Sequence, residues 1–492
     1  MNKKRTTIFL MNRRFRRRLK SKEKRRLRVL NKCIRNKIEE KYKELFSKIN
    51  SYNDALKYLL PKNLSYLISE NKSPFYIFKL KEPEYKDMVR VYVPENFSII
   101  DNEKDSLFFL KSIVSILIFQ KSKTLLLDYT KCKSVDLFTQ IYLDAILSDF
   151  CLFMKRCERA KVNKYLKVNS IGGENMKDRK VRRLLNSVGS PAILMNRNVS
   201  YDGVKPYRLR CFDGSCLNPN SRKAQKEIDT TTLLDYVNEC LSKVNKTLTN
   251  DASQNLGYVI GETIINAEEH SSLHYRYLIG YFEEYNDGDK HYGLLNLVIM
   301  NFGQTIYEKF RSPLFGTRVN EKCVEQMEEL SEDYRRKNRF KQHFTEETLW
   351  TLYSLQGGVS CIPPDIRLRG NGTIQFINSF FKLKGNDRVD NVSCMYLLSG
   401  NTRIDFDGTY QLHKIRANNG DYKDIISFNK SGLLTDEPDR KFVRNVSTYF
   451  PGTAIFAKLL INDDDLKNGL KIIEMKKKRF CCMEFILKLQ RK

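Results

Sequence analysis

Glu262 and Asn266 are the side chains whose types and spacing point most directly to chemistry in this chain. They are four residues apart in the stretch LGYVIGETIINAEEHSS, which covers 256–272, so both would project from one face of a helix. Apolar residues recur in this stretch at three- and four-residue steps, and this spacing predicts an amphipathic helix. A carboxylate and a carboxamide beside a buried surface cost free energy unless they have a function. Binding a metal ion together with a phosphate group is one such function.

The same stretch resembles the first ATP-binding box of the GHKL superfamily, which includes gyrase-type and chaperone-type ATPases, histidine kinases and anti-sigma-factor kinases. The resemblance rests on Glu262-x-x-x-Asn266 followed by Ala267-x-Glu269-His270. It implies ATP and Mg²⁺ as cofactors. It further implies that Asn266 ligates Mg²⁺, which bridges the phosphates, and that Glu262 orients or deprotonates the attacking water, or a substrate hydroxyl in a kinase.

A second box is expected after two apolar segments, 275–285 and 292–300, which the turn sequence NDGD separates and which therefore predict a β-hairpin. The residues that follow, NFGQTI, resemble the family's Asp-x-Gly-x-Gly box, with Asn301 in place of the Asp and Thr305 in place of the second Gly. The resemblance implies that Asn301 reads the base and that Gly303 lets the backbone approach the nucleotide. A carboxamide can accept the hydrogen bond of the adenine amino group, but it can also donate one, so the choice of base stays open.

Two further boxes follow in the order that the family requires. Gly370 and Gly372, in the sequence RGNGTI, resemble the Gly-x-Gly box that turns backbone amides toward phosphate at the start of a helix. Thr453, in FPGTAIF, resembles the final signature, in which the Thr hydroxyl helps to hold the carboxylate, here Glu262, or a phosphate. The long charged segment near 310–360 lies where the family carries a mobile lid over the nucleotide.

The order of these four boxes implies the fold. We expect an α+β protein in which residues 227–462 form a GHKL-type two-layer sandwich of helices on a mixed sheet. Residues 101–195 are expected to form a smaller α/β domain before it, because the strand-like TLLLD lies between two apolar helical patterns. Residues 51–100 are expected to be a connector, and residues 196–226, which are rich in Asn, Gly, Pro and Ser, an interdomain linker.

The smaller domain resembles the STAS fold of anti-sigma-factor antagonists, on the run LLLDYTKCKSVDLFTQIYLDAIL. In that family a phospho-acceptor Ser or Thr follows the Asp that opens a helix. If Asp136 is that Asp, the acceptor position holds Leu137, although Ser134 and Thr139 lie close by. We therefore expect this STAS-like domain to dock a protein partner or to be structural, and not to be phosphorylated at position 137.

The positive charge of the chain is concentrated at its start. The net charge is +29, and residues 1–50 hold 20 Lys and Arg against four Glu. Such a basic arm, which we expect to be helical, favours contact with nucleic-acid phosphates or with an acidic partner. No ladder of aromatic residues for base stacking is evident in it, so we expect binding that does not read sequence. Residues 463–492 form a second basic segment with an amphipathic pattern.

The composition also sets expectations about location and secondary structure. No apolar run is long enough to cross a membrane, and the twelve cysteines lack metal-binding spacing, so we expect a cytoplasmic protein with free thiols. The further helices that the patterns predict are Ser106–Phe119, Arg179–Val188, Ile228–Leu248, Glu321–Arg339 and Thr373–Phe381. The further strands are Phe75–Leu80, Val89–Val93, Val392–Ser399, Arg403–Phe406 and Thr409–Leu412.

Three functions fit these expectations. The first is a Mg²⁺- and ATP-dependent ATPase that acts as a nucleotide-controlled switch, with ATP-dependent homodimerisation, in a bacterial regulatory or phage-defence module. The second is an anti-sigma-type Ser/Thr protein kinase. The third is a non-catalytic, nucleic-acid-binding scaffold with a degenerate ATP site, which Asn301, Thr305 and the basic arm favour.

Overall fold

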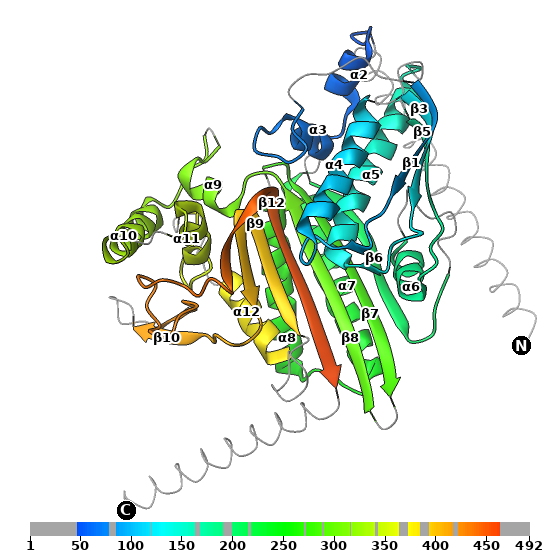
Figure 1. Ribbon diagram of the computed structural model, residues 1–492. Helices are drawn as coiled ribbons and strands as arrows, with labels where there is room; N and C mark the ends of the chain where they lie inside the picture. The colour runs from blue at the N-terminus through cyan, green and yellow to red at the C-terminus, as the bar shows by residue number, and fades with distance from the viewer. Residues whose placement is uncertain are drawn as a thin grey trace, which may run out of the picture. The chain divides into compact units, whose positions relative to one another are not determined.

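A computed structural model gives the fold of the chain, which is a mixed α+β structure (Figure 1). The residues that it describes are 47–77, 85–119, 121–162, 168–189, 199–214, 218–269, 272–287, 290–314, 316–339, 343–363, 372–383, 393–416 and 422–462. The predicted basic arm at 1–50 lies almost wholly outside these ranges, and the basic tail at 463–492 lies outside them altogether.

The chain divides into two compact units, of which the first comprises 1–61 and 151–166. Its described part contains α2 (Tyr52–Leu59), which begins with a capping box because Ser51 Oγ accepts a hydrogen bond from Asp54 N and the Asp54 carboxylate accepts one from Ser51 N. The second unit comprises 62–150 and 167–492 and contains the two sheets described next.

A small parallel sheet lies in the N-terminal part of the second unit. Its order is β1 (Tyr85–Tyr92), β3 (Lys121–Asp128) and β5 (Val168–Glu174). The connections between neighbouring strands contain α4 (Glu103–Phe119) and α5 (Leu137–Arg159), as parallel pairing requires. The predicted α/β layer is therefore present, but it begins at β1. The strand predicted at 89–93, within the connector predicted over 51–100, is confirmed as part of β1, which starts earlier, whereas the first residues of the strand predicted at 75–80 are not in a strand.

Three short elements complete this layer. β2 (Asn96–Phe97) pairs in parallel with β4 (Ser134–Val135), and α6 (Arg179–Val188) has the bounds that the sequence predicts. α3 (Lys62–Ser69) also belongs to the second unit and contacts the larger sheet at β8.

α5 is long and apolar enough to cross a membrane by length and composition alone. However, 78% of its most apolar window is buried in the protein, which is the pattern of a core helix. Many of its apolar side chains are fully buried, including Phe138, Ile141 and Leu147.

The larger sheet has five strands in the order β6 (Val204–Asp213), β7 (Tyr275–Asp287), β8 (Lys290–Phe302), β12 (Val443–Asn462) and β9 (Cys394–Phe406). All four neighbouring pairs are antiparallel, so the expectation of a mixed sheet is wrong for these strands. The predicted hairpin is confirmed as β7 and β8. β9 is one continuous strand where two shorter ones were predicted.

The edge strand β6 overturns the prediction of a linker over 196–226. Val204–Asp213 pairs with β7, and α7 (Pro219–Lys243) starts soon afterwards, with Asn218 accepting a hydrogen bond from Ser221 N as its cap. An edge strand can carry a proline and several charges because one of its sides makes no ladder hydrogen bonds. Pro206 and the alternating arginines of this strand therefore looked like loop sequence.

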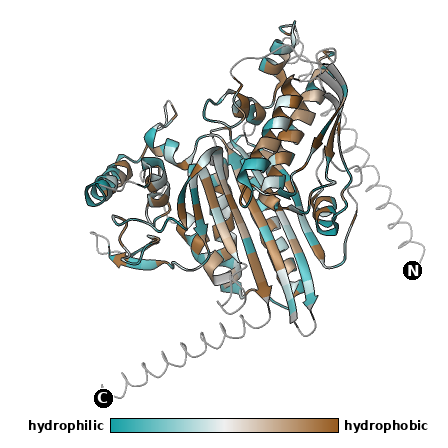
Figure 2. Cartoon of the chain, in the orientation of Figure 1, coloured by the Kyte–Doolittle hydropathy of each residue, from teal (hydrophilic) through white to brown (hydrophobic). Residues whose placement is uncertain are grey.

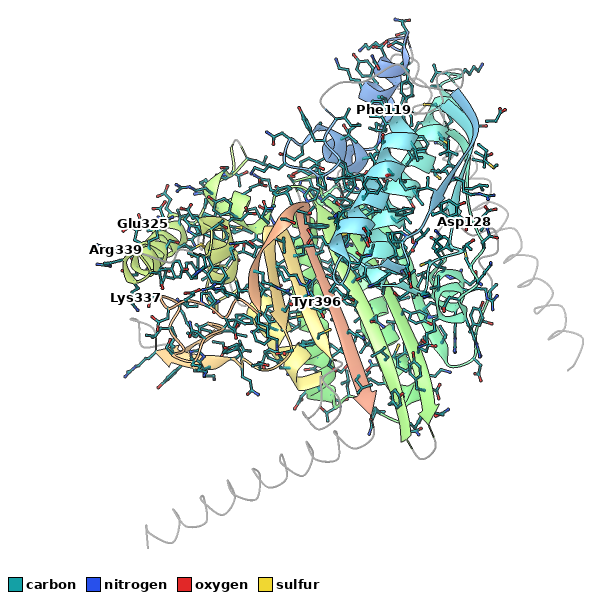
Figure 3. All side chains as sticks on the ribbon, in the orientation of Figure 1. Phe119, Asp128, Glu325, Lys337, Arg339 and Tyr396 are labelled. Atoms are coloured by element: carbon teal, nitrogen blue, oxygen red, sulfur yellow. The ribbon has the colours of Figure 1, made fainter. Side chains whose placement is uncertain are left out.

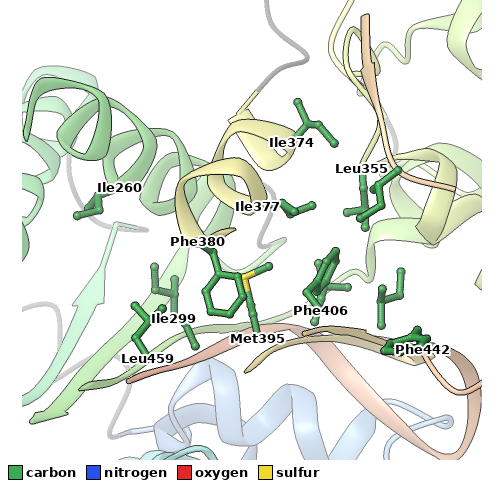
Figure 4. Packing of buried hydrophobic residues seen from close by; sticks show 14 of the residues in the cluster. Ile260, Ile299, Leu355, Ile374, Ile377, Phe380, Met395, Phe406, Phe442 and Leu459 are labelled. Carbon is green, nitrogen blue, oxygen red and sulfur yellow. The ribbon is translucent and has the colours of Figure 1, made fainter. Parts of the chain in front are cut away.

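Three helices pack on one face of the larger sheet: α7, α8 (Asn250–Glu269) and α12 (Gly372–Leu383) (Figure 1). The main hydrophobic core fills the space between these helices and the strands, and Figure 4 shows Phe380 of α12 over Met395 of β9 and Ile299 of β8. Brown, apolar segments run along the sheet and along the helices beside it (Figure 2). The helix predicted at 256–272 is thus a core helix of this layer.

The segment near 310–360, which was predicted to be a lid, is largely a packed pair of helices. α10 (Glu321–Lys337) and α11 (Glu346–Tyr353) join through the fully buried Trp350, whose Nε1 donates to Ser331 Oγ at 2.9 Å. Figure 3 shows Glu325, Lys337 and Arg339 on the outside of this pair. α9 (Ile306–Arg311) lies mostly before the predicted lid, and the lid prediction remains untested for the loop after α11.

The segment predicted as a strand at 409–412 is a bend followed by irregular backbone, and it precedes the small antiparallel hairpin of β10 (His413–Arg416) and β11 (Tyr422–Ile425). Gln356, in the loop after α11, is fixed to the end of this hairpin. Its side chain donates to Ile426 O at 3.1 Å and accepts from Ile426 N at 2.9 Å. One end of the loop is therefore tied down by a buried carboxamide.

The opposite face of the larger sheet contacts the α/β layer through aromatic rings. The ring centroid of Tyr142, in α5, lies 5.4 Å from those of both Phe302, the last residue of β8, and Phe450, which is within β12. Nearby, Tyr66 of α3 donates a hydrogen bond to Gly303 O at 3.0 Å. Because successive side chains of a strand point to opposite faces, Asn301 and Phe302 contact different layers of the protein.

Candidate functional site

One cavity brings together four of the predicted site residues, Glu262, Asn266, Asn301 and Thr453. It lies between α8, the β8 and β12 strands, α9, α12 and the loop after α11. It encloses about 990 Å³ of space including its open mouth. The apolar part of its lining consists of Ala267, Ile299, Ile306, Phe310, Leu355, Val359, Phe376, Leu397 and Ile455.

α8 presents Glu262 and Asn266 to this cavity from successive turns, and both side chains are half-buried. The other side of the helix packs closely on α7 at two glycines. A Cβ atom at Gly257 would lie 3.2 Å from the Leu234 side chain, and one at Gly261 would lie 3.5 Å from Thr230. The small residues that interrupt the apolar stripe thus set the distance between the two helices.

A buried ion cluster ties the end of α8 to the sheet. Arg276 of β7 is fully buried and forms ion pairs with Glu268 of α8 and with Asp229 of α7, the latter at 2.5 Å. Its guanidinium carbon lies 3.9 Å from the centre of the Phe212 ring. Buried charges are tolerated only when they are paired, so this cluster fixes the positions of both helices relative to β7.

Asn301 is at the floor of the cavity, near the end of β8, and only 1% of it is exposed. Its side-chain nitrogen is buried and has no hydrogen-bond partner among the described residues. Its cross-strand partner on β12 is Thr453. A Cβ atom at the neighbouring Gly452, which has φ +149°, would lie 2.1 Å from Asn301 O, so only glycine allows β12 to approach this turn.

Thr453 lies beside Asn301 and hydrogen-bonds to the sheet. Its hydroxyl is 3.0 Å from Ser399 Oγ, and Ser399 in turn donates to Gly452 O and accepts from Ile306 N. No hydrogen bond between Thr453 and Glu262 is present among the described residues. The predicted hydrogen bond from Thr453 to Glu262 is therefore not found, because the Thr453 hydroxyl bonds to Ser399 of the neighbouring strand β9.

Thr305, which stands where the family has a second glycine, is the N-cap of α9. Its side chain accepts a hydrogen bond from Glu308 N at 3.2 Å, and Glu308 Oε2 accepts one from Thr305 N at 3.1 Å. This departure from the family pattern thus has a local structural reason. Gly303 precedes it with φ +123° and is held by Tyr66, but it is not among the residues that line the cavity.

The predicted phosphate-binding glycines lie at the edge of what the structure describes. Gly370 lies outside the described residues, whereas Gly372 is the first residue of α12. The next residue, Thr373, lines the cavity. The N-terminus of α12 is therefore at the cavity, where its backbone amides and the helix dipole favour an anion.

Lys309 is a cavity residue that the sequence analysis missed. Among the described residues that line the cavity it is the sole cation, and Glu262 is the sole carboxylate. Burial lowers the pKa of Lys309 to about 8, although Cys361 and Glu308 oppose the shift. The spacing in the sequence contained a signal for it. Lys309 is three residues after Ile306, and Phe310 is four residues after it, so all three share one face of α9, and all three line the cavity.

The donor set at α8 fits a hard cation that takes most of its ligands from phosphate and water. The described residues contain no group of three His, Cys, Asp or Glu that could hold a metal ion by themselves. The Asn266 carboxamide oxygen, one turn from Glu262, offers oxygen ligands of the kind that Mg²⁺ takes. The eight described cysteines form no disulfide bond.

In the α/β layer, the predicted phospho-acceptor position next to Asp136 is buried. Leu137 and Thr139 are buried, and Thr139 Oγ1 donates to Asp136 Oδ2 and accepts from Ile99 N, both at 2.7 Å. Ser134 is exposed, and its hydroxyl donates to Asn96 Oδ1 at 2.8 Å. Of the hydroxyls near Asp136 that were considered as acceptors, only Ser134 is therefore accessible to another protein.

Comparisons with protein-family models, with curated protein sequences and with solved structures found no match to this chain.

Proposed function

We propose that the protein binds ATP with Mg²⁺ in the cavity under α8 and hydrolyses it, as a GHKL-type ATPase that acts as a nucleotide-controlled switch in a bacterial regulatory or defence module. The observation that carries this proposal is the convergence of Glu262, Asn266, Asn301 and Thr453 on one cavity. These residues come from three segments that are far apart in the sequence. Residues with no common role would have no reason to meet around one partly apolar space.

The lining supports a division of the cavity into an apolar part and a charged part. A flat base would pack between aliphatic side chains such as Leu397 and Ile455, with Asn301 hydrogen-bonding to its edge. The Asn266 carboxamide would hold Mg²⁺, which neutralises the phosphates when it is bound. Lys309 would contact a phosphate as the cation of the cavity, and the N-terminus of α12 would offer backbone amides.

Glu262 would act on the attacking water. Its carboxylate accepts a proton as the water oxygen bonds to the γ-phosphorus and the bond from that phosphorus to the bridging oxygen of ADP breaks. The products are ADP and inorganic phosphate, and the proton on Glu262 returns to solvent. The residue is half-buried at the cavity, a place from which a carboxylate can both reach water and be shielded from bulk solvent.

The contacts behind the cavity suggest how its occupancy could reach a partner. Asn301 is followed by Phe302, which contacts Tyr142 of the α/β layer, and by Gly303, which accepts the hydrogen bond of Tyr66. A shift of this turn on nucleotide binding would therefore move groups of the STAS-like layer, which we propose docks a protein partner. The proposed contact of residues 1–50 with nucleic acid and the ATP-dependent homodimer remain further parts of this proposal.

The test is Mg²⁺-dependent ATP binding by the purified full chain, followed by release of free phosphate. We expect Asn266→Ala to lose metal-dependent binding, and Glu262→Ala to bind ATP but to lose hydrolysis. The matched control is Asn255→Ala, because Asn255 is exposed on the same helix and does not line the cavity. Binding that survives in Asn266→Ala would contradict the proposed Mg²⁺ site.

The same experiment separates the two other candidate functions. Labelled phosphate that appears on a protein, with little free phosphate, would indicate a Ser/Thr kinase. Failure of the wild-type protein to bind any nucleoside triphosphate would indicate a scaffold, and the next question would be what the basic arm binds.

A further inference from the structure

The Asn301 carboxamide is the most conspicuous polar group that the fold leaves unsatisfied in the cavity. It is almost completely buried, and its nitrogen has no hydrogen-bond partner among the described residues. A buried amide N–H without a partner destabilises a protein, so native structures rarely keep one without a functional reason. The position of Asn301 in the lining of the cavity means that a bound ligand can supply the missing acceptor.

The neighbouring hydroxyls are committed to the sheet. Thr453, the cross-strand partner of Asn301, is 3.0 Å from Ser399 Oγ. Ser399 also donates to Gly452 O at 3.0 Å and accepts from Ile306 N at 3.0 Å. Because these groups satisfy one another, the carboxamide of Asn301 is the part of the floor that remains free to read a ligand edge with both a donor and an acceptor.

We propose that Asn301 recognises the edge of a purine base through both of these groups, and that the site therefore accepts 6-oxo purines, such as hypoxanthine and guanine, as well as adenine. This inference rests on the proposed nucleotide-binding function. Adenine offers an amino donor beside the N1 acceptor, and a 6-oxo purine offers an O6 acceptor beside the N1–H donor. A carboxamide matches either pattern after a half-turn about its terminal torsion, which has two nearly equivalent positions.

An aspartate at the same place would behave differently. An ionised carboxylate only accepts hydrogen bonds, so it can pair with the adenine amino group or with the N1–H of a 6-oxo purine, but in each case it repels the acceptor beside that donor, which is N1 of adenine or O6 of the 6-oxo purine. Removing the donor should therefore weaken the binding of both kinds of purine without selecting between them. This contrast makes Asn301→Asp the informative substitution, since it replaces one nitrogen by oxygen and leaves the shape of the side chain nearly unchanged.

The experiment is competition of unlabelled ATP and ITP, with Mg²⁺, against a ribose-labelled fluorescent ATP on the full chain. ITP is the probe because hypoxanthine has the 6-oxo edge without the 2-amino group of guanine. For the wild-type protein we expect the dissociation constants of ATP and ITP to agree within about tenfold. For Asn301→Asp we expect both dissociation constants to rise by about tenfold or more, the effect of one unpaired buried hydrogen-bonding group, with their ratio still within about tenfold.

The control is Asn296→Asp. Asn296 is on the same strand but on its other face, where its side chain donates to Tyr281 O at 3.5 Å. It should leave both dissociation constants unchanged.

The wild-type comparison needs no variant, so it decides the matter even if Asn301→Asp fails to fold. Wild-type protein that binds ATP but is not competed by ITP would overturn this inference and leave the proposed ATPase function intact. Protein that binds neither nucleotide would overturn both. Unchanged dissociation constants in a folded Asn301→Asp variant would show that another group reads the base.

Discussion

The floor of the cavity and the start of α5 are two regions that bury polar side chains at the end of a strand or the beginning of a helix. At the start of α5, Thr139 exchanges hydrogen bonds with Asp136 and Ile99, and every partner is in the chain itself. At the cavity, Asn301 is equally buried, but its nitrogen has no partner. Both regions lie in the same unit of the chain.

The difference separates a structural role from a ligand-binding role. A polar group that the fold satisfies contributes to stability, and its neighbours leave no space for a ligand. A polar group that the fold leaves open at a cavity keeps its hydrogen-bonding capacity for something else. By this reasoning the hydroxyl at Thr139 is part of the cap of α5, although the sequence placed it next to a suspected phosphorylation site.

The largest effect is expected at the ion cluster that supports the cavity. Arg276→Met should reduce the free energy of unfolding by about 3–5 kcal/mol, because it leaves the buried carboxylates of Glu268 and Asp229 without their main partner. Denaturant unfolding measures this loss. Arg336→Met is the control, since Arg336 is 70% exposed and its ion pair should contribute little. A loss below about 1 kcal/mol for Arg276→Met would mean that the cluster does not hold α8.

Gly452→Ala should be nearly as damaging, and it should affect the cavity directly. The added methyl group would overlap Asn301 O, and alanine is strained at φ +149°, so we expect a loss of about 3 kcal/mol or more. Gly316→Ala isolates the conformational part, because Gly316 has φ +81° but no atom within 4 Å of the added group. Equal losses for the two variants would show that the close approach to Asn301 is not what requires glycine.

Thr139→Val tests the satisfied side of the comparison. It removes the partner of Ile99 N and one partner of Asp136, so unfolding should become easier by about 1–3 kcal/mol. Because Thr139 is not at the cavity, the dissociation constant of Mg²⁺-ATP should stay the same. Thr409→Val, at an exposed position, is the control for stability. A weaker affinity of Thr139→Val for Mg²⁺-ATP would show that the α5 cap affects the cavity, and Thr139 would then not have a structural role alone.

The smallest effect on stability, and the most specific effect on binding, is expected for Lys309→Met. Lys309 is protonated below its pKa of about 8 and loses its charge above it, so the affinity for Mg²⁺-ATP should fall as the pH rises beyond 8. The variant should bind about tenfold more weakly at pH 7 and should lose this pH dependence. Its stability should not decrease, because burial disfavours the charged amine in the folded state.

Titration of affinity between pH 7 and pH 9.5, with Lys322→Met as the control on the exposed face of α10, measures the effect. The same pH dependence in wild type and Lys309→Met would assign it to another group. The linkage to stability has the opposite sign: since the folded-state pKa of Lys309 is below its unfolded value, stability should rise as the pH increases above about 8, and only in chains that keep Lys309.

The sequence by itself determined the elements whose patterns are local. The helix with Glu262 and Asn266, the β7–β8 hairpin and α6 follow from residue spacing and turn sequence, which depend on neighbours within a few positions. The identity of four cavity residues also came from the sequence, because each lies in a short motif and the motifs follow one another in a recognisable order.

Only the tertiary structure decided which of these residues contact one another and which lack a hydrogen-bond partner in the protein. Asn301 and Thr453 are neighbours because β12 inserts between β8 and β9, a pairing across many residues that no local pattern contains. Another pairing, of β6 with β7, made an edge strand of a segment with loop-like composition. The packing of α9 placed Lys309 in the lining of the cavity. Whether a polar side chain has a partner depends on these distant contacts, so the open carboxamide of Asn301 could be found only in the folded chain.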